Sequence, residues 1–165
     1  MPWSANEASL GIAVVRRWYE PRLWAVVNNA SWGLQLSEAD VYAVSKAGVT
    51  HEVEVKISAA DLRADARKSR WREQPIKWQS NFYWLCVPPE LSVLAMERAA
   101  LIGAGVYVVH GPDADSTLKY GNCVRALKAP RHEYAHRRDR DLRNRVWRLA
   151  ALRYWDRLIA NGNYA

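Results

Sequence analysis

The segment from Asp40 to Ile57 places the tightest constraint on how this chain folds. Two apolar runs, 41–44 and 49–57, flank a turn that contains Gly48. From Glu52 onward the second run alternates strictly between polar and apolar residues. Because successive side chains of a strand point to opposite faces, this alternation predicts a strand. We therefore expect a two-stranded hairpin with strands at 40–45 and 49–57.

The polar positions of this second strand concentrate charge on one face. Glu52, Glu54 and Lys56 share that face, and Asp40 opens the neighbouring strand. Two carboxylates and an ammonium group that meet at a sheet edge are able to hold a divalent metal and a phosphate. A solvated strand face with a Glu–Lys cross-strand pair is the alternative interpretation, and the sequence leaves it open.

Composition indicates one intracellular domain with an anionic partner. The chain has 165 residues, half of them apolar, and carries a net charge of +7 with a pI of about 9.6. This balance favours nucleic acid as a partner. Two cysteines do not make a disulfide framework, and Cys86 sits in an apolar run typical of a core residue. We see no signal peptide and no apolar run near the roughly 20 residues that span a bilayer, so a reduced, cytoplasmic location is expected.

The remaining pattern predicts an α/β domain with a mixed sheet and helices on both faces. Ser4 with Glu7 is a candidate capping box for the first helix, and Gly103 fits a helix C-terminus. Strand–helix–strand order after residue 82 predicts a parallel pair with a right-handed crossover. The expected helices are 4–19, 58–69, 90–102 and 132–159, and the further expected strands are 23–27, 82–87, 106–109 and 122–127.

The charged face has the residue types that phosphodiester hydrolysis requires. Cutting this bond needs an activated water, a counter-charge for the phosphate oxygens and help for the leaving oxygen, and Mg²⁺ or Mn²⁺ supplies all three. We expect Asp40 and Glu54 to be metal ligands, with the backbone carbonyl of Val55 completing the set. Lys56 would orient the attacking water or offset charge in the transition state. The proposed catalytic residues are therefore Asp40, Glu54 and Lys56.

The order Asp40, then Glu54-Val55-Lys56, resembles the PD-(D/E)xK nuclease superfamily, which has the restriction-endonuclease-like fold. The stretch from Glu54 through Asp65, followed by Lys, Arg and Trp residues and then 82–88, is similar to MmcB-type DNA-repair nuclease-like proteins. The resemblance covers about residues 5–110. It implies a metal-dependent DNA endonuclease in repair, recombination or phage DNA metabolism. It also implies a nuclease-like domain at 1–130, with residues 131–165 as an Arg-rich helical extension packed on it.

The sequence departs from the superfamily pattern before Asp40, because no proline precedes this residue. Glu38, two positions away on an extended segment, shares the face of Asp40 and is able to assist it. Many members also use a glutamate from the first helix. Glu7 and Glu20 are both candidates, and the sequence does not separate them.

Basic residues directly follow the charged strand and are placed to hold a nucleic-acid backbone. The expected DNA contacts are Arg63, Arg67, Lys68, Arg70 and Lys77. Trp71 and Trp78 are interleaved with them and either stack on unpaired bases or cap the core. The Arg-rich C-terminal helix either docks on the domain or pairs with another copy, which makes a homodimer possible. A non-catalytic nucleic-acid-binding module of the same fold is the main alternative to a nuclease.

His132-Glu133-Tyr134-Ala135-His136 spells the H-E-x-x-H motif of zinc proteases. On a helix this spacing places two imidazoles on one face with the glutamate as base. No third ligand follows with a recognisable motif, and Arg137 and Arg138 oppose a bound cation. A zinc protease is therefore a distant third hypothesis, and a solvated helix start is the favoured interpretation of this segment.

Overall fold

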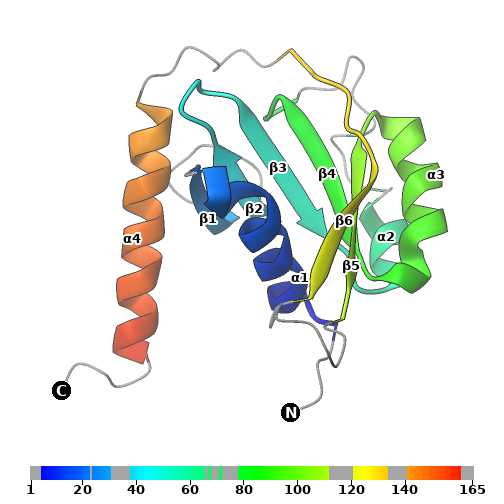
Figure 1. Cartoon of the computed structure of the whole chain (residues 1–165), viewed down its shortest axis with the longest axis horizontal. Coiled ribbons are helices and arrows are strands. Elements are labelled where there is room, and N and C mark those ends of the chain that lie inside the picture. Colours follow the sequence, from blue (N-terminus) through cyan, green and yellow to red (C-terminus); the bar gives the residue numbers. More distant parts are fainter. Residues whose placement is uncertain are drawn as a thin grey trace.

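A mixed six-stranded sheet runs through the part of the molecule that the structure describes, with strands in the order β1-β2-β3-β4-β5-β6 (Figure 1). The structure is a computed structural model, and it describes residues 5–22, 24–30, 38–65, 67, 71, 78–111, 121–133 and 141–160. The strands are β1 (Ala25–Ala30), β2 (Ala39–Val44), β3 (Thr50–Val55), β4 (Phe82–Val87), β5 (Gly105–His110) and β6 (Asn122–Leu127). The helices are α1 (Glu7–Val14), α2 (Ala59–Asp65), α3 (Ser92–Ile102) and α4 (Leu142–Ala160), with short segments η1 (Val15–Tyr19), η2 (Glu20–Arg22) and η4 (Pro89–Leu91).

The sheet combines an antiparallel meander with a parallel centre. β1, β2 and β3 pair antiparallel, β3, β4 and β5 pair parallel, and β6 returns antiparallel along β5. The predicted α/β class, the parallel pair after residue 82 and the strand at 122–127 are therefore confirmed. β1 continues to Ala30, past the strand end expected at residue 27, because Asn28 pairs with Val41.

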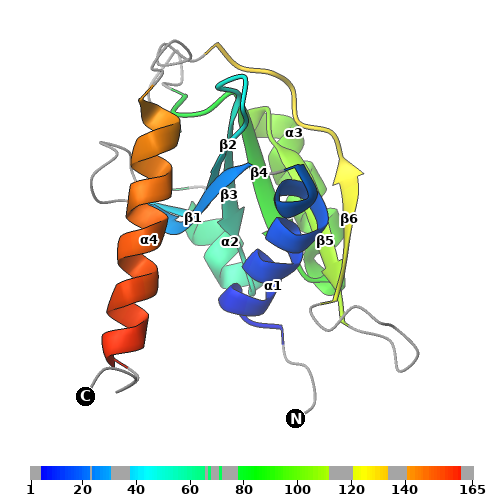
Figure 2. The same ribbon diagram turned by 60° about the vertical axis from the view of Figure 1, so that its left-hand side comes forward.

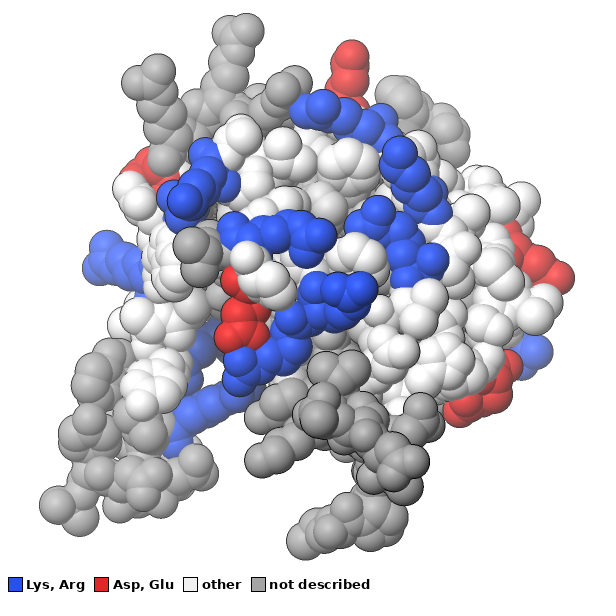
Figure 3. All heavy atoms as spheres, in the orientation of Figure 1, with Lys and Arg blue, Asp and Glu red and all other residues white. Residues whose placement is uncertain are grey.

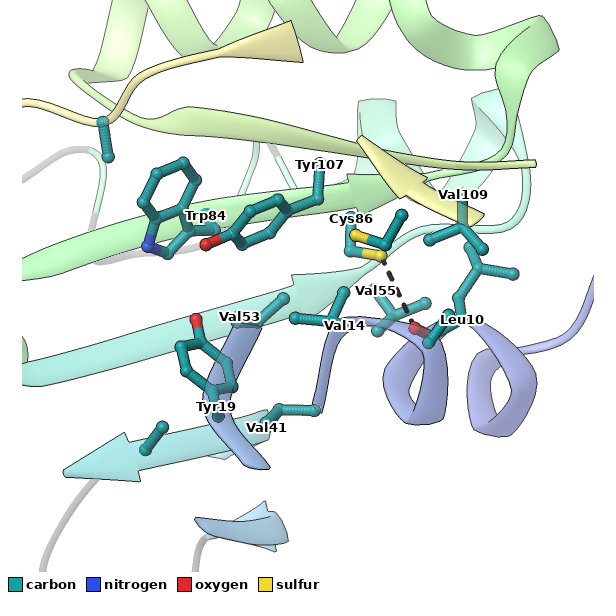
Figure 4. Packing of buried hydrophobic residues seen from close by; sticks show 14 residues of the cluster. Leu10, Val14, Tyr19, Val41, Val53, Val55, Trp84, Cys86, Tyr107 and Val109 are labelled. Carbon is teal, nitrogen blue, oxygen red and sulfur yellow. Dashed lines mark hydrogen bonds between the residues drawn. The ribbon is translucent and has the colours of Figure 1, made fainter. Parts of the chain in front are cut away.

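One face of the sheet packs against α1 and η1. Leu10, Ala13 and Val14 from α1 are buried on apolar side chains of β2 to β5 (Figure 4). These sheet residues are Val41, Val53, Val55, Trp84, Cys86, Tyr107 and Val109. Cys86 is fully buried, as expected, and both cysteines are free thiols. Burial of the apolar face of α1 explains why this segment stays on the sheet.

His51 lies within this aromatic face of the core. Its ring centroid is 4.7 Å from those of Trp24 and Phe82 and 5.8 Å from that of Trp84. The indole N–H of Trp84 donates to His51 Nδ1 at 3.1 Å, and the Tyr19 hydroxyl is 3.3 Å from the same nitrogen. An indole nitrogen only donates, so Nδ1 is the acceptor and the imidazole is neutral. Burial, with a smaller contribution from the charge of Arg125, lowers the pKa of His51 to about 3.

The opposite face is covered by α2, α3 and α4, which lie over different parts of the sheet (Figures 1 and 2). Leu62 of α2 and Ala95 and Ala99 of α3 pack with Tyr83, Leu85 and Val87 of β4. Leu142 and Val146 of α4 pack instead on β1 and β2, against Ala25, Val27, Tyr42 and Val44. This face is therefore covered by two separate clusters. Among the described residues, no helix is both long and apolar enough to cross a membrane.

The helix boundaries correct two predictions. α1 begins at Glu7 with Asn6 as its cap, and Asn6 and Ser9 exchange reciprocal hydrogen bonds in place of the expected Ser4–Glu7 pair. α4 begins at Leu142. Residues 132–133, which were expected to be helical, are not part of a helix. The expected start of the second helix at residue 58 is confirmed, because Ser58 Oγ accepts from the N–H of Asp61 at 3.1 Å and caps α2.

Two glycines after α3 are required by their positions. Gly103 ends the helix in the left-handed conformation with φ of 71°, as expected from the sequence. At Gly105 a Cβ atom would lie 2.4 Å from the Trp84 ring and 2.6 Å from the backbone nitrogen of Ala129. β5 therefore approaches the indole so closely that only glycine fits there.

Candidate functional site

The three residues predicted to be catalytic meet at one end of β2 and β3. Val41 pairs with Val53, so continuing this antiparallel register by one residue sets Asp40 opposite Glu54. Glu54 alternates with Val53 and Val55, which face α1, so its own side chain points to the face covered by α2. Asp40 Oδ2 accepts a 2.6 Å hydrogen bond from the backbone N–H of Val55. Because the N–H and C=O of one strand residue lie on the same edge, the Val55 carbonyl is directed to this side as well.

Lys56 follows β3 and is held between two carboxylates. Its Nζ donates to Glu54 Oε1 at 2.8 Å and lies 4.0 Å from Asp65 Oδ1. The side chains of Lys56, Glu54 and Asp65 are 11 %, 6 % and 0 % exposed, so this is a buried charge cluster. The face is therefore not solvated, although the Glu–Lys ion pair of the alternative interpretation is present between Glu54 and Lys56.

Asp65 is a member of the cluster that sequence reasoning missed. It ends α2 on the same side as Leu62, three residues earlier, which packs into the core. Its Oδ2 accepts from the indole N–H of Trp71 at 3.1 Å. An acid at the spacing of a buried helix face was the available signal. Its encounter with Lys56 depends on how α2 crosses the sheet.

Asp40 is poised to titrate near neutrality. Partial burial raises its pKa from 3.8 to about 6, and the charge of Glu54 adds to this increase. The Val55 N–H and Lys56 oppose the increase, and Glu7 contributes a smaller upward effect. A carboxylate whose pKa is raised by a neighbouring carboxylate marks a place where a cation would be favourable.

Asp40→Asn is expected to stabilise the metal-free protein by about 1–2 kcal/mol at pH 8, a value reduced for the partial exposure of this side chain. The folded pKa lies above the unfolded one, so the ionised carboxylate lowers stability as pH rises from 3.8 through about 6. Asparagine removes that charge and keeps an acceptor for the Val55 N–H. The measurement is urea unfolding in EDTA at pH 8 and below pH 4.

At the lower pH the stabilisation by Asp40→Asn should vanish, since the aspartic acid is already neutral. The control is Glu38→Gln, which removes an exposed acid two residues earlier and is expected to change little at either pH. A loss of stability at pH 8 in the Asp40 variant would contradict the assignment of a repulsive environment.

The structure distinguishes Glu7 from Glu20, the two candidates for an additional acid from the first helix. Glu7, at the start of α1, acts on the pKa of Asp40. Glu20 forms an ion pair with Arg16, beyond the opposite end of α1. Glu38 is exposed. Within the described part of the chain, no group of three or more His, Cys, Asp or Glu side chains is gathered closely enough to hold a metal ion.

The expected DNA-contacting residues are described only in part. Arg63 and Arg67 are exposed, and Lys68, Arg70 and Lys77 lie outside the described residues. At the margin of the core, Trp71 packs edge-on to Trp78 and to Tyr83, and Trp78 is tilted against Tyr83. Of the two roles predicted for these tryptophans, their contacts support capping of the core.

The H-E-x-x-H segment makes structural contacts at its first histidine. The His132 ring stacks on Trp78 with centroids 3.6 Å apart, and its Nε2 donates to the Gly103 carbonyl at 2.6 Å. The backbone N–H of His132 also donates to Asn81 O at 2.8 Å. His136 lies outside the described residues. The expected helical placement of the motif is wrong at residues 132 and 133, and the contact with Gly103 occupies Nε2, one of the two imidazole nitrogens that are able to bind a metal.

Comparison of the sequence with known protein families and with curated proteins finds no match. Among solved structures, the fold is similar to the SPO1766 protein of unknown function from Silicibacter pomeroyi. The TM-score is 0.57 at 19 % sequence identity, and the match covers 92 % of this chain and 86 % of that one. At this identity the similarity concerns the fold alone.

Proposed function

We propose that the protein is a metal-dependent DNA endonuclease of the PD-(D/E)xK type, with Asp40, Glu54 and Lys56 as its catalytic residues. The observation that carries the proposal is the convergence of these three side chains at the end of β2 and β3. Their elements follow one another as α1, β1, β2, β3, α2 and β4, which is the order expected for a restriction-endonuclease-like core.

The donor set fits a hard divalent cation. Asp40, Glu54 and the Val55 carbonyl would hold Mg²⁺ or Mn²⁺, which when bound supplies charge stabilisation to a phosphate and lowers the pKa of a coordinated water. Mg²⁺ commonly uses one or two carboxylates and keeps several waters, so a third acidic side chain is not required. The repulsion that raises the pKa of Asp40 is the feature that such a charge would relieve.

Lys56 would act on the phosphate and on the attacking water. Its ammonium group donates to Glu54 and lies close to Asp65, so its position is fixed before substrate arrives. A pre-positioned donor aimed at developing negative charge accelerates reactions of this kind. Asp65, itself held by Trp71, would serve as a positioning residue for Lys56. Buried ion pairs contribute little net stability, which favours a functional interpretation of this cluster.

Nicking of a supercoiled plasmid tests the proposal. We expect relaxation of the plasmid with Mg²⁺ or Mn²⁺ and none in excess EDTA, in protein purified free of host nucleases. Salt-sensitive DNA binding with no cleavage under any divalent metal would identify the alternative, a non-catalytic binding module of the same fold.

A further inference from the structure

A cavity of about 550 Å³ lies away from the acidic cluster, where η1, β1 and α4 meet. In both ribbon views β1 lies between α4 and the end of α1 (Figures 1 and 2). The cavity therefore wraps the outer edge of the sheet, whereas Asp40 and Glu54 lie inward on β2 and β3. Its volume is within the range of about 300–1,000 Å³ that small-molecule sites occupy.

Three aromatic rings line this cavity. Trp24 is held rigidly, because it stacks on Tyr19 with centroids 5.3 Å apart and meets His51 edge-on at 4.7 Å. Trp147 and Tyr154 face it from α4 and are 51 % and 60 % exposed. They are two helical turns apart, so they lie on the same side of α4. Large aromatic side chains left this exposed present flat apolar surface to a ligand.

Arginines surround the aromatic rings. Arg16, Arg153 and Arg157 line the cavity, against a single acid, Glu20, which already pairs with Arg16. The guanidinium of Arg153 is fixed by a 2.6 Å hydrogen bond to the backbone carbonyl of Asn29. The face formed by α1 and β6 carries many Lys and Arg side chains and few acidic ones (Figure 3). The ligand should therefore be both flat and anionic.

We propose that this cavity binds an unpaired base of single-stranded nucleic acid, with its phosphates on the surrounding arginines. Bases stack on aromatic side chains without regard to sequence, and a basic groove follows the backbone. A base in a duplex is stacked on its neighbours and does not enter such a cavity without being extruded. The proposal goes beyond the cleavage proposed above, because it concerns binding at a separate place.

The test is the affinity for a fluorescein-labelled oligothymidylate and for a duplex of the same length, measured by anisotropy in EDTA. The parent should bind the single strand more tightly. Trp147→Ala should weaken single-strand binding about tenfold, the loss of one stacked base, and duplex binding less than about twofold. Leu152→Ala is the matched control, since Leu152 is 52 % exposed on the same helix and does not line the cavity.

A second matched pair of variants distinguishes binding in the cavity from non-specific electrostatic binding to the basic surface. Arg157→Ala should weaken single-strand binding more than Arg148→Ala does. Arg148 is an exposed arginine of α4 that lies outside the cavity.

Equal effects of Trp147→Ala and Leu152→Ala would overturn the proposal. So would a change in sedimentation of Trp147→Ala with unchanged oligonucleotide affinity, which would make the cavity a contact between two copies. Because binding is measured without metal, a protein that binds but never cuts refutes the nuclease alone, and a protein that cuts while Trp147→Ala binds normally refutes this inference alone.

Discussion

Glu54→Gln is expected to reduce Mg²⁺-dependent cleavage by about 10²–10³-fold while the protein remains folded, the loss typical of removing one preorganised electrostatic group. The substitution preserves the shape of the side chain and removes the charge that Lys56 and a metal ion would share. Lys56→Ala should produce a loss of similar size, because its Nζ lies 2.8 Å from Glu54 and belongs to the same unit. The measurement is the initial rate of plasmid nicking, and the double variant should lose little more than either single one.

Glu52→Gln is the matched control for this experiment. Glu52 lies on the same face of β3 as Glu54 and is 2 % exposed. In the sheet register it lies opposite Tyr42 of β2. Both substitutions replace a buried carboxyl group of the same strand with an amide, so both are expected to shift the melting temperature. Only the Glu54 variant should lose cleavage. Parallel losses of activity in the two variants would mean that the buried charges serve the fold rather than the chemistry.

Acid is expected to remove about 4–5 kcal/mol of folding stability through His51 alone. The pKa of His51 is about 3 in the folded protein and near 6.5 when unfolded, so between these values only the unfolded chain takes up the proton. The part of the folding stability that depends on a neutral His51 is therefore complete above pH 6.5. It falls by about 1.4 kcal/mol per pH unit down to pH 3. Urea unfolding across this range measures the slope.

His51→Asn isolates this effect from other titrating groups. Asparagine keeps an acceptor for the indole N–H of Trp84 and does not titrate. The variant should be less stable at pH 7, because the smaller side chain leaves space among Tyr19, Trp24 and Phe82. The difference between parent and variant should shrink as pH falls from 6.5. A constant difference would show that His51 does not carry the acid sensitivity.

The sequence predicted the sheet better than the helix ends. Strand periodicity and apolar runs are local, and they placed all six strands. The start of α1 was wrong because Ser4-x-x-Glu7 and Asn6-x-x-Ser9 are both capping spacings, and local chemistry does not decide between them. Residues 132–133 continued a helical pattern, but contacts of His132 with Trp78 and Gly103 hold them in another conformation. Such contacts join residues far apart in the chain.

The part of the candidate site that lies on one hairpin was predictable from the sequence. Asp40, Glu54 and Lys56 come together through the register of two adjacent strands, which alternation and a short turn specify. Asp65 reaches Lys56 only through the path of α2 over the sheet, which the pattern of one helix does not contain. The cavity at β1 was not predictable either, since it depends on where α4 returns to the sheet.

The attachment of α4 has a consequence for anything that enters this cavity. In the described residues the helix is held by Leu142 and Val146 near its start, with Leu149 and Ala150 partly buried beside them, and by the hydrogen bond from Arg153 to the Asn29 carbonyl. Trp147, Tyr154 and Arg157 extend along the cavity. A helix packed at the edge of the sheet opens more readily than the central strands. If a strand binds there as proposed, occupancy of the cavity and closure of α4 form one coupled equilibrium. The bound strand would hold the helix in place, and the apparent affinity would fall in proportion to the fraction of time that the helix is detached.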